Sequence, residues 1–182
     1  AAIALLGQGF LGRIRNALGA DAAAVRLYNA DTEKLYLMTH EGLSEAFVSN
    51  ESEMHCGDCL CGDVIESGLP VAFDTSNPPP GMKLRTCIRE GFATAAAFTV
   101  QYDRQRVGVF NLYFRESRPV SAQETNLLET LGQHLGVAIE NQRLRAREKE
   151  LAVSEERNLL AQDLHDSIAQ GLAFLNIQVQ LL

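Results

Sequence analysis

The first residues whose types and spacing could support chemistry are His165, Asp166 and Gln170, near the end of the sequence. A neutral imidazole keeps a lone pair on one ring nitrogen and can attack a phosphoryl group. A carboxylate that accepts the other ring N–H fixes the tautomer and stabilises positive charge as the P–N bond forms. Asp166, directly after His165, suits this general-base role. A His-Asp pair alone is weak evidence, because most histidines on helices are simply surface residues.

The second candidate group is a set of four cysteines. Cys56, Cys59 and Cys61 fall within six residues, and Cys87 follows further along the chain. In a reducing cytosol such clustering indicates metal binding or redox chemistry rather than disulfide staples. Four thiolates could bind one zinc ion or one iron–sulfur cluster, with His55 as a spare ligand. Thiols that bind nothing, and one or two disulfides, are alternatives that the sequence leaves open.

Hydrophobic periodicity predicts the elements that must position these groups. Apolar residues recur every four positions and predict a helix over residues 1–19. Two shorter helices are expected at 62–68, ending at Gly68, and at 83–90. The last of the predicted strands is long and mostly apolar, so we expect it to be central in the sheet. The predicted strands are 22–28, 34–40, 71–74, 94–102 and 105–114.

One long helix is predicted from Glu124 to Leu182, because no proline interrupts this segment. Ser121 and Glu124 have the spacing of a capping box at its start. Residues 142–158 are heavily charged, as in an exposed two-stranded coil. The apolar stripe that follows would be left in water in a single chain, so we expect a parallel dimer. The stripe consists of Leu164, Ile168, Leu172, Leu175, Val179 and Leu182.

Composition excludes several functional classes. The chain has 16 basic and 23 acidic residues and a net charge of −7, without a basic stripe, which makes it a poor candidate for binding nucleic acid. No apolar run approaches the roughly 18 residues of a membrane span. The apolar start, residues 1–10, lacks the basic leader of a signal peptide. We expect both ends to be cut from a longer protein, because the chain begins without Met and stops within a helical pattern.

The order helix, two strands, small helices, two strands and long helix resembles the GAF sensory fold. The most telling residues are 106–113, 119–124 and 127–141, which read RVGVFNLY, PVSAQE and LLETLGQHLGVAIEN. The resemblance covers about residues 1–143 and implies an α+β domain with a central antiparallel sheet flanked by helices. GAF domains bind cyclic nucleotides, tetrapyrroles, haem or iron, and we find no ligand signature here outside the cysteines.

Residues 155–182 read EERNLLAQDLHDSIAQGLAFLNIQVQLL. This string resembles the dimerisation and phosphotransfer helix (HisKA_3 type) of sensor histidine kinases of the nitrate/nitrite sensor (NarX/NarQ) type. The shared pattern is Glu-Arg, then Leu-His-Asp, three residues and Gln. The resemblance implies that His165 is the phosphoacceptor in ATP-dependent autophosphorylation and that Asp166 is the general base. It also implies that Gln170 positions the water that removes phosphate from the partner response regulator.

The same resemblance implies the partners of the chain. They are a second copy of the chain, a kinase domain that binds ATP with Mg²⁺, and a response-regulator receiver domain of the NarL type. It further implies that the chain is the cytoplasmic region of an inner-membrane protein. The sequence has no phosphate-binding Gly loop, so we expect this chain to be inactive alone.

We therefore expect a GAF domain over 1–143, a signalling-helix linker over 144–158, and the first helix of the phosphotransfer domain over 159–182. Two other functions are open. One is a GAF module that binds a small molecule, or senses metal or redox state, and only dimerises through its helix. The other is a GAF methionine-sulfoxide reductase that uses the cysteines. Neither alternative needs the string around His165.

Overall fold

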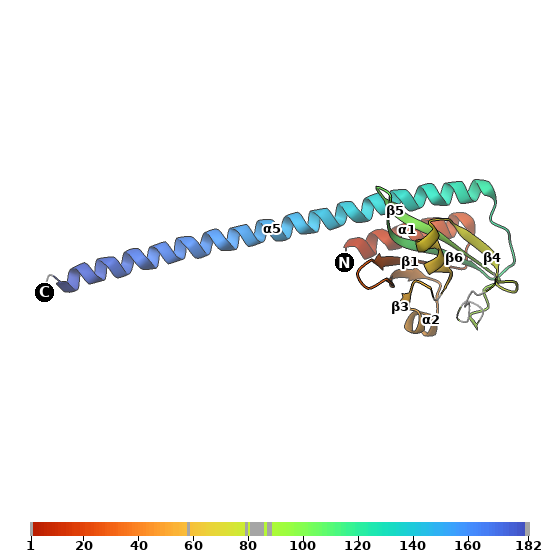
Figure 1. The fold of residues 1–182 in the computed structure, drawn as a ribbon, viewed down its shortest axis with the longest axis horizontal. Helices are drawn as coiled ribbons and strands as arrows, with labels where there is room; N and C mark the ends of the chain where they lie inside the picture. The colour runs from red at the N-terminus through yellow and green to blue at the C-terminus, as the bar shows by residue number, and fades with distance from the viewer. Residues whose placement is uncertain (1, 58, 79, 81–85, 87–88, 181–182) are drawn as a thin grey trace. The chain divides into compact units, whose positions relative to one another are not determined.

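The structure is a computed structural model that describes residues 2–57, 59–78, 80, 86 and 89–180 (Figure 1). The chain divides into two compact units, residues 1–140 and 141–182. Cys87 and most of the expected helix at 83–90 lie outside the described residues.

Unit 1, residues 1–140, is built on a six-stranded antiparallel sheet with the strand order β3-β2-β1-β6-β5-β4. All five predicted strands are present. The prediction that β6 is central is confirmed, since β6 lies between β1 and β5 and every residue from Val107 to Phe114 is buried. The short strand β3 was not predicted, since its pairing with β2 rather than its own sequence defines it. The strands are β1 (Ala22–Asn29), β2 (Lys34–Glu41), β3 (Glu53–His55), β4 (Val71–Asp74), β5 (Thr94–Tyr102) and β6 (Gln105–Phe114).

A two-residue turn joins the long strands β5 and β6. Asp103 and Arg104 both have positive φ angles, 42° and 64°. Two consecutive left-handed residues give a hairpin turn whose twist matches that of the flanking strands. The turn therefore fixes the register in which Tyr102 pairs with Gln105.

Helices cover both faces of the sheet. The helix α1 (Ala2–Leu18) and the unit 1 part of α5 (Ala122–Gln180) pack on one face (Figure 1). The shorter helices α2 (Glu45–Asn50) and α3 (Leu60–Ser67) pack on the other face. The predicted α+β class is confirmed.

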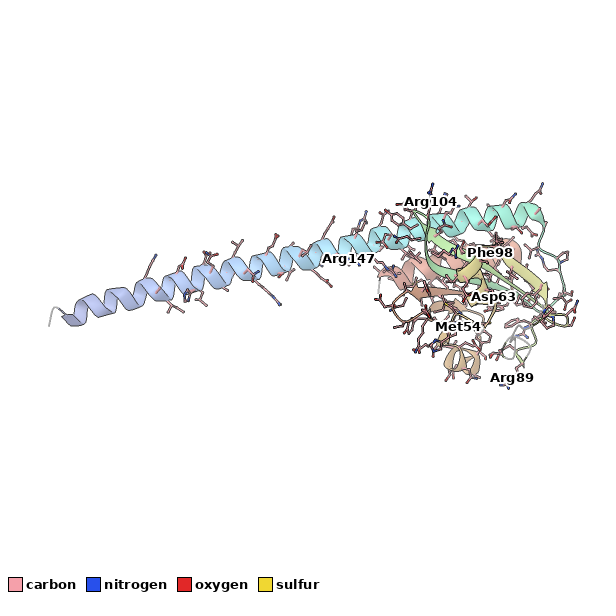
Figure 2. The ribbon with its side chains drawn as sticks, in the orientation of Figure 1. Met54, Asp63, Arg89, Phe98, Arg104 and Arg147 are labelled. Atoms are coloured by element: carbon pink, nitrogen blue, oxygen red, sulfur yellow. The ribbon has the colours of Figure 1, made fainter. Side chains whose placement is uncertain are left out.

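The two faces form two separate apolar cores, because successive residues of a strand point to opposite sides of a sheet. On β1, Val25 belongs to the core under α1 and α5, whereas Ala24 belongs to the core under α2 and α3. Figure 2 labels one residue of each core, Phe98 for the first and Met54 for the second. The second core also holds the described cysteines.

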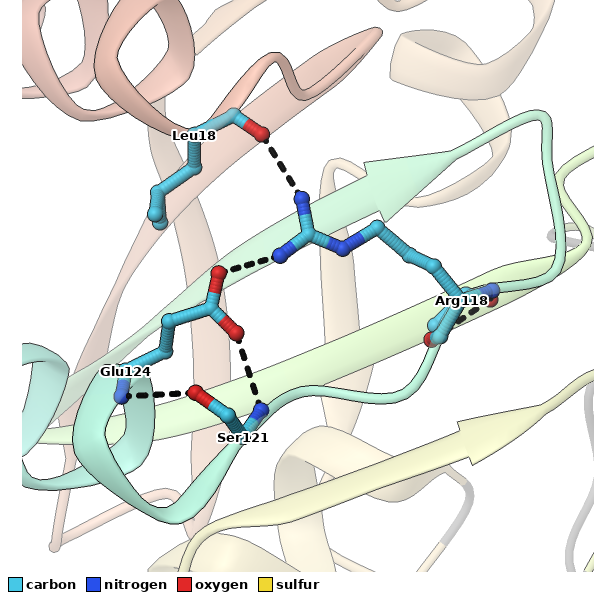
Figure 3. A network of polar contacts seen from close by, with 5 residues as sticks. Leu18, Arg118, Ser121 and Glu124 are labelled. Atoms are coloured by element: carbon cyan, nitrogen blue, oxygen red, sulfur yellow. Dashed lines mark hydrogen bonds and ion pairs between the residues drawn. The ribbon is translucent and has the colours of Figure 1, made fainter.

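The predicted capping box at the start of α5 is confirmed (Figure 3). The backbone N–H of Glu124 donates to the Ser121 hydroxyl at 3.2 Å, and the backbone N–H of Ser121 donates to the Glu124 carboxylate at 2.8 Å. Arg118 forms an ion pair with the same carboxylate and donates to the backbone carbonyl of Leu18 at 2.9 Å. This network ties the end of α1 to the first turn of α5.

Two glycines allow α5 to approach β5 closely. A Cβ atom added at Gly132 would lie 2.1 Å from the carbonyl oxygen of Thr99. A Cβ atom added at Gly136 would lie 2.1 Å from the carbonyl oxygen of Gln101. Both glycines weaken a helix on propensity alone, so their place in α5 reflects this packing.

Unit 2, residues 141–182, is helical as far as Gln180. Every residue from 151 to 170 is exposed. Among the described residues, none of the helices combines the length and apolar character needed to cross a bilayer.

Candidate functional site

His165, Asp166 and Gln170 lie within little more than one turn of α5, and all three are exposed. Successive residues of a helix are about 100° apart around its axis, so Gln170 follows Asp166 along nearly the same face. The exposed His165 is accessible from solvent in this chain. The carboxylate of Asp166 directly follows His165 in the helix, and the neutral amide of Gln170 follows one turn later.

Apolar side chains surround this stretch without being covered. Leu164, one residue before His165, is 63 % exposed, and Ile168 is 52 % exposed. Leu159 and Leu160, one turn earlier, are exposed to a similar degree. A contiguous exposed apolar surface of this kind is typical of an interaction site.

The cysteine segment leads directly into α3. Cys59 is the N-cap residue of this helix, and Cys61 lies in its first turn. A Cβ atom added at Gly62 would lie 2.6 Å from the carbonyl carbon of Cys56. Gly62 thus permits the backbone at Cys56 to pack against the start of α3.

The other end of α3 is also fixed. Gly68 ends the helix with a φ angle of 75°, in the left-handed region that favours glycine. The Arg106 guanidinium, from β6, donates to the terminal carbonyls of the helix at Ile65 and, at 2.6 Å, Glu66. A helix held at both ends keeps Cys61 in one position over the sheet.

A buried polar cluster lies beneath Cys61. The Asn111 amide, from β6, donates to the Cys61 sulfur at 3.1 Å. Arg26, from β1, is fully buried and donates from Nη1 to the backbone carbonyl of Glu51 at 2.5 Å. The Nε atom of Arg26 has no hydrogen-bond partner among the described residues. Buried arginines are rare unless their charge is compensated.

The electrostatics of the cluster favour a negative charge at Cys61. The hydrogen bond from Cys59 lowers the pKa of Cys61 to about 7, with help from the Arg26 charge and Asn111 and against the effect of burial. Burial works to lower the pKa of Arg26, but Cys61 and other nearby groups raise it above its ordinary value. Burial raises the pKa of Cys56, so this thiol is the less acidic of the two.

The described cysteines do not by themselves form a metal site. Cys56, Cys59 and Cys61 are thiols rather than disulfides. Within the part of the chain that the structure describes, no three His, Cys, Asp or Glu side chains are grouped to hold a metal ion. Because Cys87 lies outside that part, a zinc or iron–sulfur site that uses all four cysteines stays a prediction.

Sequence reasoning missed Arg26 and Asn111. Each belongs to a strand whose other core-facing residues are apolar, such as Ala24 and Val109. A charged or amide side chain at an inward position of such a strand is the signal that could have revealed them. The contact with Cys61 could not be predicted, because it joins residues 50 positions apart.

Solved structures share the fold of the first unit. The GAF domain of a phosphoenolpyruvate-protein phosphotransferase from Coxiella burnetii matches with a TM-score of 0.68 at 23 % identity, over 78 % of this chain and 86 % of that chain. This likeness shows the fold alone.

Sensor histidine kinases are the relatives in sequence. The chain is 34 % identical to the sensor histidine kinase YhcY of Bacillus subtilis over 135 residues, which are 71 % of this chain and 36 % of the relative. It is 35 % identical to the nitrate/nitrite sensor protein NarX of Escherichia coli over 75 residues, which are 41 % of this chain and 12 % of NarX. The chain thus spans about a third of the first relative and a smaller part of the second.

Two protein families match separate parts of the chain. Residues 6–140 match the GAF domain family, and residues 156–182 match the histidine kinase family HisKA_3. The first match covers most of unit 1, and the second contains His165, Asp166 and Gln170. The chain therefore belongs to the GAF domain family, and the helical segment that follows its GAF domain carries the histidine kinase match.

Proposed function

We propose that this chain is the signal-transmitting region of a two-component sensor histidine kinase, with His165 as the phosphoacceptor. The observation that carries the proposal is an exposed His165 inside the segment that matches the histidine kinase family. The sequence relatives, which are sensor histidine kinases, support it.

The chemistry assigned to His165 is attack on the γ-phosphoryl group of ATP bound with Mg²⁺ in a separate kinase domain. The imidazole lone pair forms the P–N bond, and the bond from phosphorus to the oxygen of ADP breaks. Asp166 accepts the proton of the other ring nitrogen and stabilises the imidazolium charge. An exposed ring suits this reaction, since the nucleotide must reach it from another domain.

Gln170 is assigned to the reverse reaction, loss of phosphate from the response regulator. Its neutral amide can orient a water toward an acyl phosphate without acting as a base, as glutamine does in GTPases. Its exposure on the face of Asp166 gives a docked receiver domain access to it. A receiver domain of the NarL type is the partner that we propose.

A second copy of the chain is the proposed cover for the exposed apolar residues of unit 2. Leu160, Leu164 and Ile168 follow a four-residue spacing, so they line one side of the helix. Burying such a stripe between two parallel helices removes it from water and leaves His165 at the edge of the interface. Dimerisation is general in the histidine kinase family.

The nitrate/nitrite sensor type and a location on the cytoplasmic side of an inner-membrane protein are also proposals. The local similarity to NarX supports both.

The test supplies an ATP-binding domain in a separate chain. The protein is mixed with radiolabelled ATP, Mg²⁺ and the ATP-binding domain of the Bacillus subtilis relative, which is first shown to label the phosphotransfer helix of its own protein. We expect an acid-labile, alkali-stable label on this chain, as phosphohistidine gives. His165→Gln should abolish the label.

The matched control is His134→Gln, because His134 is another exposed histidine of the same helix. This variant should be labelled like the wild type. Label that persists in His165→Gln, or that disappears in His134→Gln, would contradict the assignment.

A further inference from the structure

Cys59 and Cys61 differ in exposure although they are hydrogen-bonded to each other. Cys59 is half-buried at the N-cap of α3, whereas Cys61 is 2 % exposed. Cys59 is therefore the more accessible of the two residues, whereas Cys61 lies within the core. This is the arrangement of an attacking thiol with a resolving thiol next to it.

The surroundings of Cys61 are polar within an apolar core. Asn111 contacts its sulfur through both amide atoms, at 3.1 Å and 3.4 Å. The charge of the fully buried Arg26 interacts with Cys61, Tyr113, Glu51 and Cys59, in decreasing order, and its Nε atom lacks a partner among the described residues. A structural cysteine needs none of these groups, since a buried thiol packs as a small apolar side chain. These groups favour the thiolate form of Cys61, which is the form that attacks an oxidised neighbouring sulfur to make a disulfide.

We infer that Cys59 and Cys61 form a redox-active dithiol that a hydroperoxide converts to an intramolecular disulfide. The inference concerns the GAF domain alone and does not depend on the role of His165.

The chemistry takes two balanced steps. The Cys59 sulfur attacks the O–O bond of the hydroperoxide ROOH, which gives a sulfenic acid at Cys59 and releases ROH. The Cys61 sulfur then attacks the Cys59 sulfur, forms the S–S bond and releases water, which carries away both the hydroxyl group and the thiol proton. A cellular dithiol reverses the reaction by exchange. The disulfide closes a very short loop, so it should be strained and easily reduced.

The disulfide would also change the packing of α3. The two sulfurs must approach from hydrogen-bonding to covalent distance, and this movement would weaken the contacts of the Cys61 sulfur with Asn111 on β6. Arg26 would then lose its electrostatic interaction with the Cys61 thiolate, because a disulfide carries no charge. Since α3 packs against β5 and β6, oxidation of the two cysteines would change the packing at the centre of the sheet.

The experiment treats the whole 182-residue chain with one equivalent of hydrogen peroxide under native conditions, followed by alkylation and peptide mass spectrometry. We expect fragmentation of the peptide that contains Cys56, Cys59 and Cys61 to assign a loss of two hydrogens to Cys59 and Cys61, which should resist alkylation until they are reduced. In the untreated native protein, Cys59 should be alkylated at least about tenfold faster than Cys61, because Cys61 must wait for local opening.

Two variants separate the thiols. In Cys61→Ser, dimedone should trap sulfenic acid at Cys59, because the resolving sulfur is gone. In Cys59→Ser, Cys61 should stay reduced at the same peroxide dose, because it is buried. Cys56→Ser is the matched control and should still form the Cys59–Cys61 disulfide.

Three outcomes would overturn the inference. The first is a disulfide that joins Cys56 or Cys87 in place of this pair. The second is equal alkylation rates for Cys59 and Cys61. The third is stoichiometric zinc or iron in anaerobically purified protein that protects both thiols from peroxide. All three readouts use the wild-type protein, so they hold even if a variant fails to fold.

Discussion

Gly136 of α5 lies against Gln101 of β5 so closely that an added Cβ atom would be 2.1 Å from the Gln101 carbonyl oxygen. The partner atom belongs to the backbone of a buried strand and cannot rotate away. The helix and the sheet are thus in contact at a point where only glycine fits.

We therefore expect Gly136→Ala to destabilise the protein, by about 1–3 kcal/mol, because the helix must move away from the sheet. Thermal and urea unfolding monitored by circular dichroism measure this. The control is Gly9→Ala on α1, where an added Cβ meets no atom within 4 Å. That change should leave stability equal or raise it by up to about 1 kcal/mol through helix propensity. A neutral Gly136→Ala would show that the close contact does not exist.

The Asp74 carboxylate provides a prediction about pH. It accepts hydrogen bonds from the Ser117 hydroxyl at 2.6 Å, from the Ser76 hydroxyl at 2.5 Å and from the Ser76 backbone N–H at 2.8 Å. These bonds, with that from Ser117 first, lower the pKa of Asp74 to about 2. A carboxyl group whose pKa is depressed by folding stabilises the folded state above its unfolded pKa of about 4. That stabilisation is lost as the pH falls from about 4 toward 2.

Ser117→Ala should raise the Asp74 pKa toward its ordinary value, and a carbon-13 NMR titration of the carboxyl group measures this. The melting temperatures of wild type and Ser117→Ala should differ at neutral pH and converge near pH 2. Ser154→Ala, at an exposed position of α5, should change neither quantity. An Asp74 pKa near 4 in the wild type would disprove the hydrogen-bonding account.

The proposed base, Asp166, can be compared with an acid on the same helix that has no assigned role. Asp163 is exposed like Asp166 but lies two residues before His165, on another side of the helix. We expect Asp166→Asn to slow the labelling of His165 about 10²-fold or more, the usual range for loss of general-base catalysis. Asp163→Asn should be labelled at the wild-type rate, as single-turnover kinetics with the added kinase domain would show. Equal rates in the two variants would remove Asp166 from the mechanism.

Gln170 should affect only the phosphatase reaction. With phosphorylated response regulator as substrate, we expect Gln170→Ala to slow dephosphorylation and to leave labelling of His165 unchanged. Gln162→Ala, at another exposed glutamine of α5, is the control and should keep both reactions. If the Gln170 variant instead lost labelling, the residue would be needed for phosphoryl transfer itself rather than for positioning water.

Local features of this protein were determined by the sequence. The capping box of Ser121 and Glu124, the helix end at Gly68 and the strands around the Asp103–Arg104 turn each depend on residues a few positions apart. Propensity and hydrogen bonding between near neighbours decide such features. The placement of Asp166 and Gln170 beside His165 is of the same kind, because a helix fixes it by spacing alone.

The tertiary structure alone decided which distant residues meet. The pairing of β1 with β6 places Arg26 and Asn111 on one face of the sheet, and the packing of α3 brings Cys61 onto that face. The glycines of α5 likewise gain their meaning only where the helix touches β5. These contacts depend on register and on the close approach of whole elements. No local pattern predicts these contacts, because each residue is compatible with its own strand or helix whether or not its distant partner is present.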